Sequence, residues 1–261
     1  MESRIRKFSL FFTGGKALSA LSVLLLFTFL NIEEGRANLF DKIGAATDVV
    51  KAATVSDDEL KEVSKQMMAH MDEKNRVAPA NDKYAKRLAG LVKNHTNEDG
   101  ISLNYKVYLT RDVNAFATPD GSIRFFSGLM DIMTDDELLF IIGHEIAHVK
   151  LEHRLKAIRT AYMASAAAKA ASASGKLNAQ HLTEIAEKFV NAQFSQSQEY
   201  DADSYGVAFM QRHKYNVSGA EGSMRKIADL DGTAAGGKGS IFGTHPGSKE
   251  RADRIRNLSK S

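Results

Sequence analysis

The segment from Thr134 to His148 most constrains the fold, because it combines a helix start, an apolar face and two histidines. Thr134 followed by Glu137 matches the capping box that begins a helix. Apolar residues then recur at helical spacing, at Leu138, Leu139, Ile141 and Ile142. His144 and His148 are four residues apart, so their imidazoles project from one face. The chain must bury one side of this helix and place both rings together on another.

Two imidazoles at this spacing can bind one tetrahedral Zn²⁺ ion. Glu145 lies beside the first of them, where it could act as a general base toward an attacking water. The bare His-x-x-x-His pattern with this glutamate arises by chance in roughly one chain in a hundred of this length. A surface helix with two unremarkable histidines therefore stays open until a third ligand is found.

A catalytic zinc takes three protein ligands and keeps one position open. Glu152 is too far along the helix, and the metzincin spacing would put a histidine where Arg154 stands, so His153 does not fit. Glu199 is a better candidate if a second helix crosses the first. Asp203, one turn later, could hold the far nitrogen of a ligand histidine. Spacing alone leaves open that both are ordinary surface charges.

Two helices are predicted ahead of this segment. Ser56 and Glu59 form another capping-box pattern, and the methionines that follow at helical spacing are predicted to lie in the core. A second helix is predicted after Pro79, with Leu88 inward, and residues 97–100 are predicted to end it.

Strands are predicted only between the second helix and the motif helix. Residues 103–109 alternate in hydrophobicity, and residues 114–117 form a second short strand candidate. Residues 119–121, Pro-Asp-Gly, predict a turn after which residues 123–126 pair back. We therefore expect an α+β, helix-rich fold with a small, mostly antiparallel sheet beside the motif helix.

The rest of the chain is predicted to be helical with one long loop. Residues 161–174 are alanine-rich and predict a helix that stops at Gly175. Residues 182–210 are predicted to be helical over most of their length, and residues 231–243 to form a glycine-rich loop. A final basic helix would place Ile255 inward.

Charge and cysteine content exclude several classes of protein. With 35 basic and 32 acidic residues, the chain has no overall basic excess of the kind that nucleic-acid binding needs. It has no cysteine, which excludes disulfides, thiolate metal sites and a cysteine nucleophile. An apolar content of 43% is enough for a globular core.

The N-terminal region has the pattern of an export signal. Four basic residues precede or interrupt an apolar run that ends with residues 17–30, and residues 35–37 are Gly-Arg-Ala. We expect residues 1–37 to be a cleaved signal peptide, with an uncleaved membrane anchor as the alternative. Residues 38–55 would be a lead-in and residues 56–261 a single domain.

Three motifs in a fixed order resemble those of a known family: His144-Glu145-x-x-His148, Glu199-x-x-x-Asp203 and Thr244-His245-Pro246. The family is the zinc metallopeptidases that include HtpX, the CAAX prenyl endopeptidases and soluble periplasmic LoiP- and BepA-like proteins. The resemblance covers about residues 55–258. The chain differs from membrane-embedded members because residues 38–261 contain no other spanning segment.

The resemblance implies a zincin-like (minigluzincin) domain with one Zn²⁺ per chain. His144, His148 and Glu199 would be the metal ligands, Glu145 the general base and Asp203 the partner of a ligand histidine.

Two further elements would complete the site. His245 would stabilise the oxyanion, although a histidine before proline could equally make a local turn contact. Residues Asn114, Ala115 and Phe116 would be the edge strand that binds an extended peptide, although they could also be a plain core strand.

The implied function is hydrolysis of peptide bonds in extended or misfolded envelope proteins, as quality control in the periplasm, with membrane association through the N-terminus possible. Two alternatives stay open. The chain could be a zinc-stabilised, non-proteolytic binding protein, or a latent protease held shut by its own loop.

Overall fold

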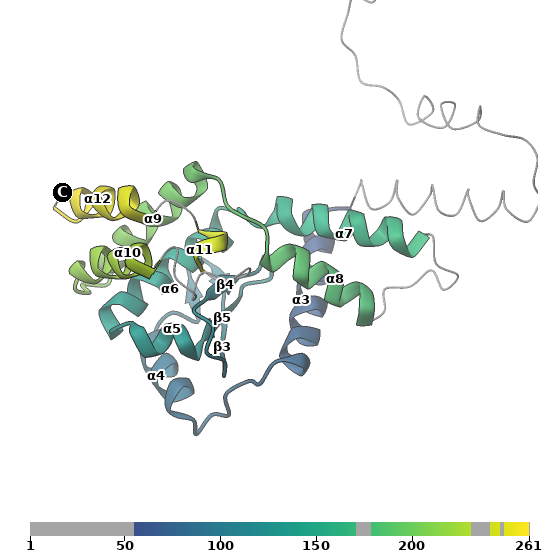
Figure 1. The fold of residues 1–261 in the computed structure, drawn as a ribbon, viewed down its shortest axis with the longest axis horizontal. Helices are drawn as coiled ribbons and strands as arrows, with labels where there is room; N and C mark the ends of the chain where they lie inside the picture. Colours follow the sequence, from purple (N-terminus) through teal and green to yellow (C-terminus); the bar gives the residue numbers. More distant parts are fainter. Residues whose placement is uncertain (1–54, 171–178, 231–240, 246–247, 261) are drawn as a thin grey trace, which may run out of the picture. The chain divides into compact units, whose positions relative to one another are not determined.

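The structure is a computed structural model that describes residues 55–170, 179–230, 241–245 and 248–260. The helices are α3 (Asp57–Lys74), α4 (Lys83–Val92), α5 (Ser127–Ile132), α6 (Asp135–Lys150), α7 (Leu155–Ala170), α8 (Ala179–Val190), α9 (Gln196–Arg212), α10 (Ser218–Leu230), α11 (Ile241–Thr244) and α12 (Ser248–Leu258). The strands are β1 (Asn97–Glu98), β2 (Ile101–Ser102), β3 (Asn104–Tyr108), β4 (Ala115–Ala117) and β5 (Ser122–Phe126) (Figure 1).

Several predictions concern residues that the structure does not describe. The export segment 1–37, the lead-in before Val55, the predicted stop at Gly175 and most of the loop 231–243 lie outside the described residues. In the ranges that are described, no helix combines the length and the apolar character needed to span a bilayer.

Side-chain caps fix the starts of the helices that matter for the site. Ser56 and Thr134 each accept a hydrogen bond from the backbone of the glutamate three residues on, which bonds back to the cap, as predicted. Ser195 and Gln198 form the same box at the start of α9. The predicted helical stretch 182–210 is therefore two helices, because residues 191–195 break it before this cap.

The sheet has the order β3-β5-β4 and is mixed. The predicted hairpin of β4 and β5 is antiparallel, but β3 runs parallel to β5, with Val107 opposite Phe125. The β4 hairpin takes one edge of β5, and β3 adds to the other edge. Hydrophobic alternation predicts which face is buried but carries no information on strand direction.

The region after the second helix differs from the prediction. Helix α4 ends at Val92, well before residues 97–100, and Asn97–Glu98 pairs with Ile101–Ser102 as a short hairpin. Asp99 and Gly100 form its turn with φ values of 50° and 82°. Residues 97–100 therefore do contain a turn, but this turn joins two strands and does not end a helix.

The two faces of the sheet contact different helices. Val107, Ile123 and Phe125 belong to the core that contains α6, α9 and α10. Tyr108 and Phe116 belong to a second core with α3, α7 and α8, which pack on one another (Figure 1). Of the methionines of α3 predicted to lie in the core, Met67 and Met68 are buried in this second cluster, and Met71 is partly buried against it.

Helices α6 and α9 cross closely because glycine stands at their contact. A Cβ atom on Gly143 would lie 2.8 Å from the Phe209 ring, and one on Gly206 would lie 2.9 Å from the Phe140 ring. This approach brings the first turns of α9 against the histidine face of α6.

Candidate active site

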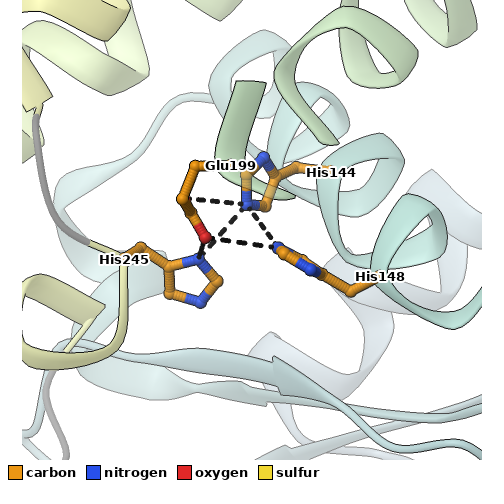
Figure 2. A group of neighbouring side chains, drawn as sticks. All are labelled: His144, His148, Glu199 and His245. Atoms are coloured by element: carbon orange, nitrogen blue, oxygen red, sulfur yellow. Dashed lines mark hydrogen bonds and ion pairs between the residues drawn. The ribbon is translucent and has the colours of Figure 1, made fainter. Parts of the chain in front are cut away.

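Four buried side chains converge where α6, α9 and the end of α11 meet (Figure 2). The Nε2 atoms of His144 and His148 are 3.0 Å apart. The Nδ1 atom of His245 lies 3.2 Å from His144 Nε2 and 2.9 Å from Glu199 Oε1. Each of the four residues offers one possible metal-ligand atom, and these four atoms all lie within 4.8 Å of one another. The crossing helix predicted from the sequence thus brings Glu199 to the two rings.

The orientation of His144 is set by an acidic partner. Its Nδ1 lies 3.1 Å from Oδ1 of Asp203. A carboxylate accepts a hydrogen bond, so Nδ1 carries the proton and Nε2 presents its lone pair to the cluster. Arg251 donates two hydrogen bonds to Asp203, at 2.8 and 2.7 Å, and also contacts Glu199. Although burial opposes it, these bonds lower the pKa of Asp203 to about 2.

Burial keeps the three imidazoles neutral. It lowers the pKa of His144 and lowers the pKa values of His148 and His245 far below their ordinary value. Neutral rings whose nitrogens face one another at about 3 Å cannot all donate hydrogen bonds to each other. Lone pairs directed at a common point, with a carboxylate beside them, are the donor set that a divalent cation such as Zn²⁺ needs.

Glu145 is buried beside this cluster and faces it. Its carboxylate oxygens have no hydrogen-bond partner of good geometry, and Oε1 lies 3.7 Å from Nε2 of His245. Burial raises the pKa of this carboxyl to about 8, and the charge of Arg154 is the largest opposing influence. A buried acid without partners is costly for stability, so its presence points to a chemical role.

Phe194 and Arg154 are among the residues of this site that were not predicted from the sequence. The ring of Phe194 stacks on His148, with centroids 3.7 Å apart and an angle of 24°. The guanidinium carbon of Arg154 lies 4.1 Å from the centroid of the Phe194 ring, and Arg154 donates a hydrogen bond of 3.0 Å to Phe189 O at the end of α8. The backbone N–H of Phe194 also bonds to Thr244 O, next to His245. No local pattern marks Phe194, because its role depends on where the α8–α9 connection passes.

The spacing of His153 excluded it as a metal ligand, and the structure places it beside the ligand histidine His148. Its Nδ1 lies 3.0 Å from Nδ1 of His148, on the far nitrogen of that ring. His153 therefore faces the Nδ1 of His148 in the same way that Asp203 faces the Nδ1 of His144.

The predicted peptide-binding strand lies next to the motif helix. Within the described residues β4 pairs only with β5, so it forms one edge of the sheet, and it contacts α6. The residues of this strand are almost completely buried in this structure: Ala115 and Ala117 are 0% exposed, and Phe116, which packs near Tyr108 and Phe126, is 1% exposed. A cavity of about 490 Å³ opens nearby, with His148, Arg154 and Gly121 in its lining.

Comparison with known proteins agrees with this geometry. The model of peptidase family M48 matches residues 82–259. The chain belongs to peptidase family M48. It is 41% identical over 219 residues to metalloprotease LoiP of Escherichia coli, covering 82% of this chain and 86% of LoiP. It is 40% identical over 219 residues to metalloprotease YcaL of the same organism, covering 82% and 85%.

More distant relatives align with a smaller part of this chain. A mitochondrial metalloendopeptidase, OMA1 of Schizosaccharomyces pombe, is 27% identical over 157 residues, which is 59% of this chain and 46% of OMA1. The protein is thus an M48 metalloprotease with a buried His144–His148–Glu199 metal site. Its substrates are polypeptides.

Proposed function

We propose that this protein is a zinc endopeptidase that hydrolyses extended or misfolded polypeptides of the cell envelope. One observation carries the proposal: the buried nitrogens of His144 and His148 and the carboxylate of Glu199 converge beside the buried Glu145, whose oxygens have no hydrogen-bond partner of good geometry. A purely structural metal site has no use for that additional buried acid.

Each side chain has a distinct role in the proposed reaction. His144, His148 and Glu199 would hold one Zn²⁺, which when bound lowers the pKa of water and polarises the scissile carbonyl. Glu145 would take the proton of the attacking water and pass it to the leaving amine. Asp203 would keep His144 in the tautomer that presents Nε2.

The substrate would bind as an extended segment along β4. An edge strand offers backbone N–H and C=O groups and reads little of the side-chain sequence. Asn114, Ala115 and Phe116 are at most 1% exposed, so they would contribute this edge through their backbone only after the segments that cover it move aside. The cavity beside His148 would take adjoining parts of the substrate. Binding of this kind favours unfolded chains of many sequences.

The direct test compares the wild type with Glu145→Gln for zinc content and for cleavage of casein, an unfolded polypeptide. We expect both proteins to retain about one zinc at this site and only the wild type to cut. Equal cleavage by both would remove Glu145 from the mechanism. Metal retention with no cleavage by either would favour the non-proteolytic binding protein instead.

A latent form is a second candidate, favoured by the position of His245. Its Nδ1 faces Glu199 and His144 as a fourth donor would. The backbone N–H of Ile241 also donates to Val113 O, close to the start of β4. If this segment holds the enzyme shut, His245→Ala will cut casein faster than the wild type. If His245 stabilises the oxyanion, the same variant will cut more slowly.

We further propose that residues 1–37 direct export and that the enzyme acts in the periplasm, where it could associate with the membrane through this segment. The N-terminal residue of protein isolated from expressing cells tests this. A chain that begins near residue 38 in the periplasmic fraction is expected, whereas an intact residue 1 in the membrane fraction would indicate an anchor.

A further inference from the structure

A second group of metal-ligand side chains lies at the other end of α9 from Glu199. His95 follows α4, Glu98 belongs to β1, and His213 caps the C-terminus of α9. Nδ1 of His95 lies 3.0 Å from Oε2 of Glu98, and Nε2 of His213 lies 3.0 Å from Oε1 of the same carboxylate. One donor atom from each of the three residues fits within 4.8 Å of the others.

The arrangement of the two rings matches that of the catalytic pair. The His95 and His213 centroids are 4.5 Å apart at an angle of 77°, and those of His144 and His148 are 4.7 Å apart at 72°. Both clusters therefore offer two nearly perpendicular imidazoles and one carboxylate. This donor set suits a borderline divalent ion such as Zn²⁺ and leaves a coordination position for water.

The surroundings of His95 also resemble those of a ligand histidine. The ring is fully buried, and its Nε2 lies 2.7 Å from the hydroxyl oxygen of Tyr215. Ligand histidines commonly use the far nitrogen in such a hydrogen bond, which fixes the ring and its tautomer.

The charges and the access are compatible with a cation. Arg212 contacts Glu98 at 3.3 Å, as Arg251 contacts Glu199 in the active site. An arginine on the carboxylate is thus common to both clusters and does not distinguish them. The side chain of His213 is 32% exposed, which gives an ion a path from solvent to the buried partners.

We propose that His95, Glu98 and His213 form a second, non-catalytic site for Zn²⁺ or a similar divalent ion. It would join the β1–β2 hairpin to the C-terminal end of α9. Because Glu199 lies in the first turn of the same helix, an ion bound here would hold in place the element that carries the catalytic ligand. The proposal does not depend on the reaction assigned to the active site.

Zinc stoichiometry of the untagged full chain, after dialysis against buffered free Zn²⁺, tests the proposal. About two ions per chain are expected for the wild type and about one for either His213→Ala or His144→Ala. The double variant should bind none. His70→Ala removes a buried histidine outside both clusters and should still bind two.

A folding control keeps the result interpretable. His213→Gln retains a polar side chain at a partly exposed position, and its circular dichroism and unfolding temperature in chelator should match those of the wild type. A wild type that saturates at one ion, or a folded His213 variant that loses none, would overturn the second site and show a purely hydrogen-bonded cluster. Loss of metal only in His144→Ala would leave the active-site proposal intact.

Discussion

Two buried polar clusters of this protein differ in how completely their hydrogen bonds are made. Around Asp72, both carboxylate oxygens accept hydrogen bonds of 2.7–3.0 Å from Tyr108, Lys106 and Arg124. Arg124, only 2% exposed, donates from its Nη1 to the carbonyls of Asn104 and Ile123. In the active site, by contrast, Glu145 is fully buried and its oxygens have no partner of good geometry.

This difference in hydrogen bonding distinguishes buried charged groups that stabilise the fold from those that take part in chemistry. The Asp72 cluster joins α3 to the sheet, and every side-chain nitrogen and oxygen atom of Asp72 and Arg124 takes part in a hydrogen bond. The active site keeps unmatched groups that cost stability, and natural proteins retain such groups where a substrate or ion completes them. The predictions below test this contrast, beginning with the largest effect.

Glu145→Gln should lower kcat for peptide cleavage by about 10³-fold, because the general base is lost. Its free energy of unfolding should stay the same or rise, since the substitution removes a buried carboxyl without partners. Steady-state kinetics with a fluorogenic peptide and urea unfolding measure the two quantities. A large loss of stability would mean that Glu145 is a structural residue like Asp72.

Asp72→Asn should have the opposite signature. It leaves the buried Arg124 without its counter-charge, so the free energy of unfolding should fall by about 3 kcal/mol. The variant should still bind zinc at His144 and His148, and its cleavage rate below the unfolding transition should be near that of the wild type. Loss of metal in a folded variant would show that the two clusters are coupled.

Phe194→Leu should weaken zinc binding by about tenfold, because the ring that holds His148 in position is removed. Phe189→Leu is the matched control: its ring is also buried and also lies near Arg154, but among the described residues it is Phe194 and not Phe189 that stacks on His148. Competition with a chromogenic chelator measures both affinities. Equal losses in the two variants would reduce the effect to general packing.

The stability difference between the wild type and Asp72→Asn should depend on pH. Burial would raise the pKa of Asp72, but the hydrogen bonds from Arg124, Lys106 and Tyr108 outweigh it and hold the pKa below its ordinary value. The stabilisation is therefore complete above the unfolded pKa of about 3.9 and is lost as pH falls through the lower folded value. Urea unfolding from pH 6 to pH 3 should show the difference shrinking only at the acid end.

The sequence predicted well those features that are local. The capping boxes at Ser56 and Thr134 formed because they need only residues three apart. The two histidines share a face because an α-helix has a fixed period. The small sheet was found from alternation, but the parallel direction of β3 was not, since it depends on how the chain between β3 and β5 is routed.

The sequence by itself determined the motif helix, the ligand types and the membership of Glu199 and His245 in one ordered set of motifs. Only the tertiary structure decided that Phe194 stacks on His148, that Arg251 joins Asp203 to Glu199, and that His95 meets His213. The physical reason is the distance along the sequence over which each interaction acts. Helix periodicity and caps act over a few residues, whereas these contacts depend on how helices far apart in the chain pack, which no local pattern encodes.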